Sequence, residues 1–287
     1  MDVAVVGAGR VGTALAVLLA KGGHEIVAAS GREASRARVD RYLPGTSYLP
    51  PAEAARRGRV ILLAVPDDAV TEVCDQVAAG DGFREGQWVA HLSGSVPLLA
   101  LGPARAAGTT VLSMHPLQTF PDVDSGIERL PGAAVAVTAW DEDGFGAGER
   151  LAMDAGTRPF RLSEERKPLY HAAAVFCSNY LVAVEGIAER LFLEAGVDDP
   201  VPLFAPLAQA TMENVVRLGP AAALTGPVAR GDAGTVRRNL EALDRHAPEA
   251  VGSYVALARA AADLAASDGR LPPADRRHIE EVLRRWS

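Results

Sequence analysis

The sequence has little cysteine, few aromatic residues and no cluster of basic side chains. Its two cysteines, Cys74 and Cys177, lie far apart and form no metal-binding or redox motif. A formal net charge of −7, with no basic patch interleaved with aromatic residues, argues against a nucleic-acid surface. We therefore expect neither a metal site nor a nucleic-acid partner.

The sequence also lacks the marks of export or membrane insertion. Its longest apolar run is short and interrupted, whereas a helix that spans a bilayer needs about 20 apolar residues. No signal-peptide pattern precedes the first predicted strand at Val3. With unpaired cysteines as well, these features favour a cytoplasmic protein that has no membrane partner.

Lysine is nearly absent. Among 29 lysine and arginine residues only Lys21 and Lys167 are lysines. Lys21 ends a predicted helix beside two glycines, where its charge complements the helix dipole. Because the composition favours arginine so strongly, a lysine that remains is a candidate for chemistry, and this directs attention to Lys167.

A glycine-rich turn follows the first apolar run, Val3 to Val6, and precedes a predicted helix. Strand, G-x-G-x-x-G and helix form the context that makes this motif specific for dinucleotides. The first glycine allows the tight turn, the second admits the pyrophosphate, and the third lets the helix pack on the strand. The helix start then offers free amides to the phosphates. The predicted cofactor residues here are Gly7, Gly9, Arg10, Val11 and Gly12.

The end of the second predicted strand, Glu25 to Ser30, indicates which dinucleotide binds. An enzyme that uses NAD usually has Asp or Glu there to bind the ribose hydroxyls. This chain has Ser30, Gly31 and Arg32 instead, although Glu33 follows. A hydroxyl and a guanidinium suit a 2′-phosphate. We predict NADP(H), with NAD as the alternative.

The first part of the chain alternates apolar strand runs with helices. Such runs are typical of parallel strands buried on both faces, and the alternation predicts an α/β domain with a doubly wound parallel sheet. After residue 165 only helical patterns follow. We expect domains at 1–165 and 166–287, the second all-helical. The further strands are predicted at 60–65, 88–92, 110–114, 133–137 and 158–162, and the later helices at 168–195, 201–218, 233–247, 250–267 and 273–286.

Three loops follow the predicted strands at the sheet edge where ligands bind. Val65, Pro66 and Asp67 are predicted to border the cofactor, as is Ser93. Ser95 could bind a carboxylate or cap a helix. A histidine at the end of a strand, His115, could donate to a carbonyl oxygen or could fasten the turn at the following proline.

The first helix of the second half carries a polar stripe. Lys167 precedes Pro168, which favours the first helical position, so Lys167 lies at the helix start. At about 100° per residue, His171 lies about 40° from Lys167, Ser178 about 20° and Glu185 near 0°. Asn179 lies about 120° away, at the edge of this face. The stripe either faces solvent or lines a cleft against the first domain. In a cleft, Lys167 and His171 would be catalytic and Asn179 would help to orient a substrate.

Three segments carry a family resemblance: Met114–Phe120, Tyr170–Asn179 and Leu224–Asp232. With them, the chain resembles proteins that join a Rossmann-like domain to a helical domain of unknown function, some of them labelled NADP oxidoreductases that use a deazaflavin. The architecture is similar to the 6-phosphogluconate dehydrogenase-like superfamily. That superfamily includes ketopantoate and pyrroline-carboxylate reductases, hydroxyisobutyrate reductases and prephenate dehydrogenases.

The chain departs from two motifs of these relatives. Ketopantoate reductases and hydroxyacid dehydrogenases have Lys-x-x-x-Asn; Lys167 matches the lysine, but His171 occupies the asparagine position. Prephenate dehydrogenases have a serine loop and then His-Pro-x-x-Gly. Ser95 and His115-Pro116 match these, but Thr119 replaces the glycine. The resemblance implies a nicotinamide-dependent reductase without selecting its substrate.

The expected function is reduction by NADPH of the C=O of a small 2-keto acid such as ketopantoate. Lys167 or His171 would donate the proton, while His115, Asn179 and Ser95 would orient the substrate. Alternatives are an imine acid such as pyrroline-5-carboxylate, hydride exchange with a deazaflavin, and an NADP(H)-binding sensor or scaffold without turnover. The apolar helices after residue 165 exceed the need of one small domain and predict a homodimer.

Overall fold

The computed structural model describes residues 1–286 and divides into two compact units, Met1–Asn179 and Tyr180–Ser287. The strand patterns end near residue 165, where the domain boundary was expected. The first helix after that point, α8 (Lys167–Val175), makes its side-chain contacts with the strands of the first unit. The first unit therefore extends past the last strand to Asn179.

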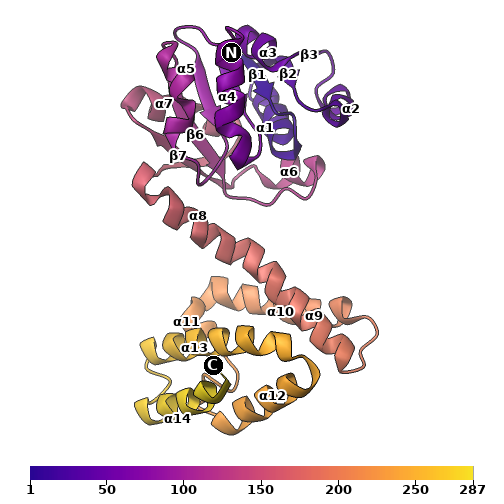
Figure 1. Cartoon of the computed structure of the whole chain (residues 1–287), viewed down its shortest axis with the longest axis vertical. Coiled ribbons are helices and arrows are strands. Elements are labelled where there is room, and N and C mark those ends of the chain that lie inside the picture. The colour runs from indigo at the N-terminus through magenta and orange to yellow at the C-terminus, as the bar shows by residue number, and fades with distance from the viewer. Residues whose placement is uncertain (287) are drawn as a thin grey trace. The chain divides into compact units, whose positions relative to one another are not determined.

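The first unit contains an eight-stranded sheet in the order β3-β2-β1-β4-β5-β6-β7-β8 (Figure 1). The chain starts in the middle of the sheet and builds outward in both directions, which is the doubly wound arrangement. The strands are β1 (Asp2–Val6), β2 (Glu25–Ser30), β3 (Ser47–Tyr48), β4 (Val60–Leu63), β5 (Trp88–His91), β6 (Thr110–Pro116), β7 (Ala134–Ala139) and β8 (Arg158–Arg161).

The predicted α/β fold is confirmed, but the sheet is not wholly parallel. Strands β1 to β6 run parallel, whereas β7 pairs antiparallel with β6 and β8 runs parallel to β7. The prediction of a parallel sheet is therefore wrong for the last two strands. The apolar pattern of β7 indicates burial on both faces and carries no information on direction.

Helices cover both faces of this sheet (Figure 1). On one face, Leu15 and Leu19 pack with Leu151 against the strands. On the other face, Val70 and Cys74 pack with Leu101. The helices of the first unit are α1 (Arg10–Lys21), α2 (Glu33–Tyr42), α3 (Pro51–Arg57), α4 (Val70–Ala79), α5 (Gly102–Ala106), α6 (Val123–Arg129), α7 (Glu142–Asp154) and α8.

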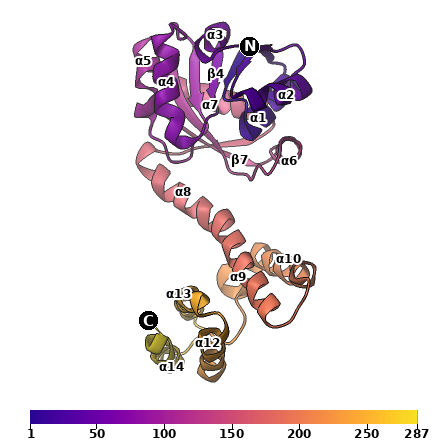
Figure 2. The ribbon, with the colours of Figure 1, turned by 45° about the vertical axis from the view of Figure 1, so that its right-hand side comes forward.

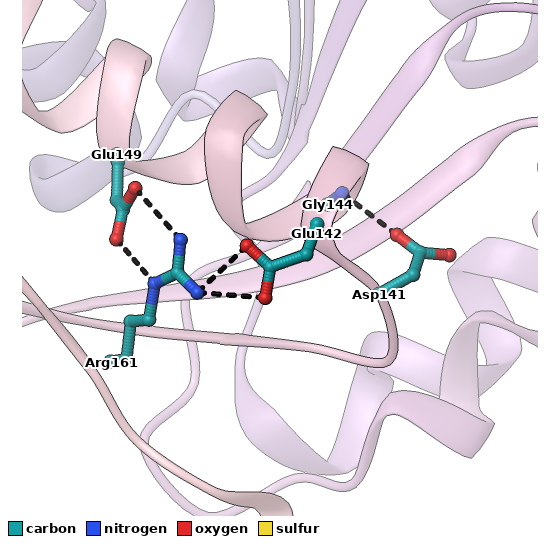
Figure 3. A network of polar contacts seen from close by, with 5 residues as sticks. All are labelled: Asp141, Glu142, Gly144, Glu149 and Arg161. Atoms are coloured by element: carbon teal, nitrogen blue, oxygen red, sulfur yellow. Dashed lines mark hydrogen bonds and ion pairs between the residues drawn. The ribbon is translucent and has the colours of Figure 1, made fainter.

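The edge strand β8 is fastened to α7 by one arginine (Figure 3). Arg161 Nε donates to Glu149 Oε1 at 2.7 Å, and its Nη1 donates to both carboxylate oxygens of Glu142 at 2.9 Å. Asp141 caps the same helix by accepting from the Gly144 amide at 2.8 Å. These contacts hold the reversed end of the sheet in place.

The second unit is all helical within its described residues, as predicted. Its core is formed by residues such as Val236, Leu240, Val255 and Ile279 of the helices α12, α13 and α14 (Figure 2). The helices are α9 (Leu181–Glu194), α10 (Pro200–Leu218), α11 (Pro220–Ala223), α12 (Ala233–His246), α13 (Val251–Ser267) and α14 (Pro273–Leu283).

Two apolar helices of this unit bury almost none of their residues. No residue of α9 is buried, and in α10 only Pro200 is. By length and composition alone, the helical stretch Glu164–Glu194, with 31 residues, could cross a membrane. Polar residues interrupt the apolar run of this stretch but leave its helix continuous, and the expectation that the protein has no membrane partner stays a prediction.

Candidate active site

A cleft of about 710 Å³ lies along the carboxyl ends of the first strands. It is bordered by the segments that follow β1, β2 and β4, which is where ligands bind in doubly wound sheets. Of the predicted cofactor residues, Gly12 and Ser93 are the two that do not line it. The lining includes Gly7, Gly9, Arg10, Val11, Ser30, Gly31, Arg32, Val65, Pro66 and Asp67.

The three glycines of the turn have separate steric roles. Gly7 has φ +98°, and a Cβ there would lie 2.6 Å from Ala64 O. A Cβ on Gly12 would lie 2.6 Å from Ala64 Cβ, so close packing accounts for this glycine although it does not line the cleft. A Cβ on Gly9 would meet nothing nearer than Gly7 O at 4.0 Å. The space over Gly9 is left open by the protein.

The helix start beside Gly9 fits a phosphate group. Gly9 is the N-cap of α1 and makes no side-chain cap, and the first turn has no acidic residue. The first amides of the helix and its positive dipole end are thus available to an anion. The turn itself is held by Ser30, whose carbonyl accepts from the amides of Gly7 and Ala8 at 2.9 and 2.8 Å. The residues present fit a dinucleotide pyrophosphate.

The end of the cleft beside β2 is rich in donors. Arg32 and Ser35 line it, as does Arg38, whose Nη1 donates to Ala8 O at 2.9 Å. Among the lining residues the one carboxylate is Asp67, which follows β4. Ser35 was not among the cofactor residues predicted from the sequence. Its spacing of three from Arg38 on α2 places the two side chains on one helix face, a signal that could have found it.

Asp67 joins the cleft to the serine loop after β5. Its Oδ2 accepts from Ser93 Oγ at 2.7 Å and from Ser95 Oγ at 2.8 Å. Ser93 Oγ also accepts from the amides of Ser95 and Val96 at 3.1 and 3.0 Å. The hydroxyl protons of both serines are therefore directed to Asp67. Ser93 fastens the loop and does not line the cleft.

Gly94 brings two histidines together on the other side of this loop. A Cβ on Gly94 would lie 2.9 Å from Cδ2 of both His115 and His171. The two rings meet edge to face with their centroids 5.9 Å apart. Tyr170 completes the cluster, since its hydroxyl lies 3.0 Å from His115 Nδ1. Tyr170 was not predicted from the sequence, although it directly precedes the candidate residue His171.

His115 lies inside its strand, because β6 continues to Pro116, two residues beyond the predicted end at Met114. It lies in β6 opposite Ala136 of β7. Burial, together with the nearby charges of His171 and Lys167, lowers its pKa to about 4. The imidazole is therefore neutral at physiological pH and has one N–H and one lone pair.

Lys167 does not line the cleft, although it was predicted to project from the helix start. It is 1% exposed, and its Nζ donates to Ser113 Oγ at 2.8 Å. Burial lowers its pKa to about 8, while Glu164 and Asp67 act in the opposite direction. His91, opposite Ser113 on β5, is also buried, and its Nε2 has no hydrogen-bond partner among residues 1–286.

Asn179, at the edge of the predicted polar stripe, lies apart from the histidines. A π-helical turn, Phe176–Tyr180, comes after α8 and contains Asn179, which is exposed. Such a turn holds an extra residue and rotates the next part of the helix out of register. Asn179 is also eight residues beyond His171, or about 12 Å along the helix. The structure does not bring it to the histidine cluster.

The described part of the chain, residues 1–286, has no group of three or more His, Cys, Asp or Glu placed to hold a metal ion. The polar side chains at or near the cluster are those of Lys167, Tyr170 and the two histidines, and each can form hydrogen bonds. All of these groups lie within the first unit.

Two family models match the chain. Residues 1–116 match a Rossmann-like domain, and residues 133–261 match a domain of unknown function, DUF2520. The chain combines these two domains, and this confirms the resemblance predicted from its motifs. A glycerol-3-phosphate dehydrogenase [NAD(P)+] of Lysinibacillus sphaericus is 33% identical over 90 residues, which cover 27% of this chain and 27% of that protein.

Solved structures are similar over nearly the whole chain. The protein BF3122 of Bacteroides fragilis, described as a candidate NADP oxidoreductase, has a TM-score of 0.76 at 23% identity and covers 91% of this chain and 98% of its own. The protein TM1727 of Thermotoga maritima has a TM-score of 0.69 at 22% identity, and the match covers 93% of this chain and 99% of that protein. An imine reductase of Myxococcus stipitatus bound to NADP+ has a TM-score of 0.62 at 15% identity, and the match covers 100% of this chain and 99% of that protein. The fold is that of NAD(P)-dependent oxidoreductases.

Replacing Gly9 by Ala tests whether a phosphate group binds in the open space over this turn. The backbone at Gly9 has φ −77°, which alanine adopts without strain, and the added methyl meets no protein atom. We expect an unchanged melting temperature and a Kd for NADPH raised at least about 10-fold, because the methyl occupies the space over the turn. The control is Gly146→Ala, also in open space. Wild-type affinity in Gly9→Ala would show that no phosphate approaches this turn.

Proposed function

We propose that the protein is an NADPH-dependent oxidoreductase that reduces the C=O of a small 2-keto acid. The observation that carries this proposal is the connection through Asp67, which lines the nucleotide cleft and binds the loop that holds Gly94 against His115 and His171. A bound nicotinamide would supply the hydride. The cluster places groups able to donate a proton at the same edge of the sheet.

The open space over Gly9 and the free amides of α1 support pyrophosphate binding. Arg32, Ser35 and Arg38 support a preference for NADP over NAD, because guanidinium and hydroxyl groups recognise a 2′-phosphate. Glu33 is not among the residues that line this end of the cleft, which supports the same preference.

The roles of the polar groups follow from their burial. Lys167, hydrogen-bonded to Ser113 inside the unit, contributes positive charge that favours an acidic substrate and stabilises a developing oxyanion. His171 is partly exposed and next to His115, which suits a proton donor. Ser95 and His115 would orient the substrate. Asn179, exposed in the π turn, would meet only a substrate that reaches beyond the cluster.

Two other enzymatic reactions use the same groups. An imine acid would receive hydride at C=N, and the similarity to the fold of imine reductases supports this alternative. Hydride exchange with a deazaflavin would need no proton donor. A sensor or scaffold would bind NADP(H) and leave it unchanged.

A panel of small oxo acids, cyclic imino acids and a deazaflavin, each assayed with NADPH and NADH, tests the proposal. We expect oxidation of NADPH that depends on a 2-keto acid and is slower with NADH. Turnover only with imino acids, or only with the deazaflavin, would replace the keto-acid proposal. Tight NADPH binding without any turnover would favour the sensor.

Replacing Arg32 by Ala tests the choice of cofactor. A charged hydrogen bond contributes about 1.5–3 kcal/mol, so we expect the Kd for NADPH to rise about 10- to 100-fold. The Kd for NADH should change less than about twofold. The matched control is Arg36→Ala, whose guanidinium lies over the ring of Tyr48, 5.0 Å from its centroid. An equal loss of affinity for both cofactors would contradict a 2′-phosphate site at Arg32.

We also propose a homodimer formed through α9 and α10. These helices line an apolar groove of about 690 Å³, in which Phe192 stacks on Phe204 with centroids 5.8 Å apart. Glu185 and Glu213 also line it, and carboxylates in a bilayer are costly, whereas they can lie at the rim of a protein interface. A second copy offers the same surface and can form a two-fold contact.

Light scattering at micromolar concentration tests the dimer. We expect twice the chain mass for the wild type and a single chain mass for Leu207→Glu, because Leu207 is 69% exposed in the groove. Leu257→Glu is the control, at a leucine of α13 that is 51% exposed. A monomeric wild type, or binding to vesicles of phosphatidylcholine and phosphatidylglycerol, would contradict the dimer.

A further inference from the structure

The imidazole of His115 is held on three sides. Gly94 lies against Cγ and Cδ2, and the ring of His171 meets it at 65°. On the third side, the ring of Tyr170 meets it at 86°, with the centroids 5.5 Å apart. Because β6 also fixes its backbone, His115 has one orientation, and the direction in which each ring nitrogen points is set by the fold.

The Nδ1 atom of His115 has a defined partner. It lies 3.0 Å from the hydroxyl oxygen of Tyr170, and this contact joins the end of β6 to the first turn of α8. A neutral imidazole and a phenol can share one hydrogen bond in two ways. Either the phenol donates to Nδ1, and Nε2 carries the ring proton, or Nδ1–H donates to the phenol, and Nε2 has the lone pair.

The surroundings of Tyr170 favour the first arrangement. Burial raises the pKa of Tyr170 to about 12, so its hydroxyl keeps its proton at neutral pH. The edge of its ring lies against Phe160, which offers no acceptor. Among residues 1–286, His115 Nδ1 is the one acceptor that lies within hydrogen-bonding distance of this hydroxyl. If Nδ1 carried the ring proton, the phenol proton would have no protein partner, and one hydrogen bond of this half-buried site would be lost.

We propose that Tyr170 is a positioning residue that fixes His115 in the tautomer with the proton on Nε2. His115 then donates a hydrogen bond from Nε2, so the group it orients must be an acceptor: a carbonyl oxygen or an imine nitrogen. This inference rests on the proposed function and gives it one further constraint. A substrate whose group at this position only donates, such as an ammonium, would not be held.

The tautomer is measured directly by NMR of the holoenzyme labelled with 15N at its histidine rings. The chain has six histidines, and the signals missing from His115→Gln identify those of His115. We expect the wild-type signals of a neutral ring protonated at Nε2. In Tyr170→Phe we expect both tautomers, because the donor to Nδ1 is gone. A wild-type ring protonated at Nδ1 would overturn the proposal, even if Tyr170→Phe failed to fold.

Kinetics give the second measurement. We expect Tyr170→Phe to lower kcat at least about 10-fold, with the KM of the keto acid and the Kd of NADPH within about twofold of the wild type. The matched control is Tyr42→Phe, which removes a phenol hydrogen bond to Asp124 away from the cluster. An unchanged tautomer together with an unchanged kcat would overturn the role of Tyr170. A wild type without turnover on the substrate panel would instead contradict the proposed function, and the NMR result would still decide the tautomer.

Discussion

The candidate site depends on one buried hydrogen bond, from Lys167 Nζ to Ser113 Oγ at 2.8 Å. A lysine that is 1% exposed is costly, and lowering its pKa from 10.5 to about 8 corresponds to a free energy on the order of 3 kcal/mol. A methionine of similar length would fill this space without that cost. A function that needs the charge or the hydrogen bond explains why the lysine is retained in a chain that otherwise uses arginine.

This hydrogen bond fixes the start of α8 against β6. Tyr170 and His171 follow one turn later on the same helix, and both reach His115. Gly94 is pressed against the two histidines, and the serines that flank it donate to Asp67 in the nucleotide cleft. Contacts between neighbouring residues thus connect the buried lysine to the cofactor end of the site. Helix α8 holds Lys167, Tyr170 and His171, and strand β6 holds His115, as accurate positioning of a substrate requires.

The sequence predicts those features that depend on local patterns. The glycine motif, the order of strands and helices and the helical second unit all follow from residues close together in the chain, and the structure agrees. Strand direction at β7 and the π turn at Phe176–Tyr180 depend on tertiary packing, and both were missed. Tyr170 escaped notice because its partner is 55 residues away in sequence. Lys167 was singled out by composition, but its burial could not be foreseen, since the first turn of a helix is usually exposed.

The most direct test of the central claim is hydride transfer measured in a single turnover of Lys167→Met with NADPH labelled with deuterium at C4. Methionine keeps the packing of the side chain and removes its charge and hydrogen bond. We expect an unchanged Kd for NADPH and a rate of label transfer to the keto acid at least about 100-fold below wild type, because the charge that stabilises the developing oxyanion is gone. Lys21→Met, at the only other lysine, should behave as the wild type. Label transfer by Lys167→Met at the wild-type rate would show that the buried lysine has no part in the reaction.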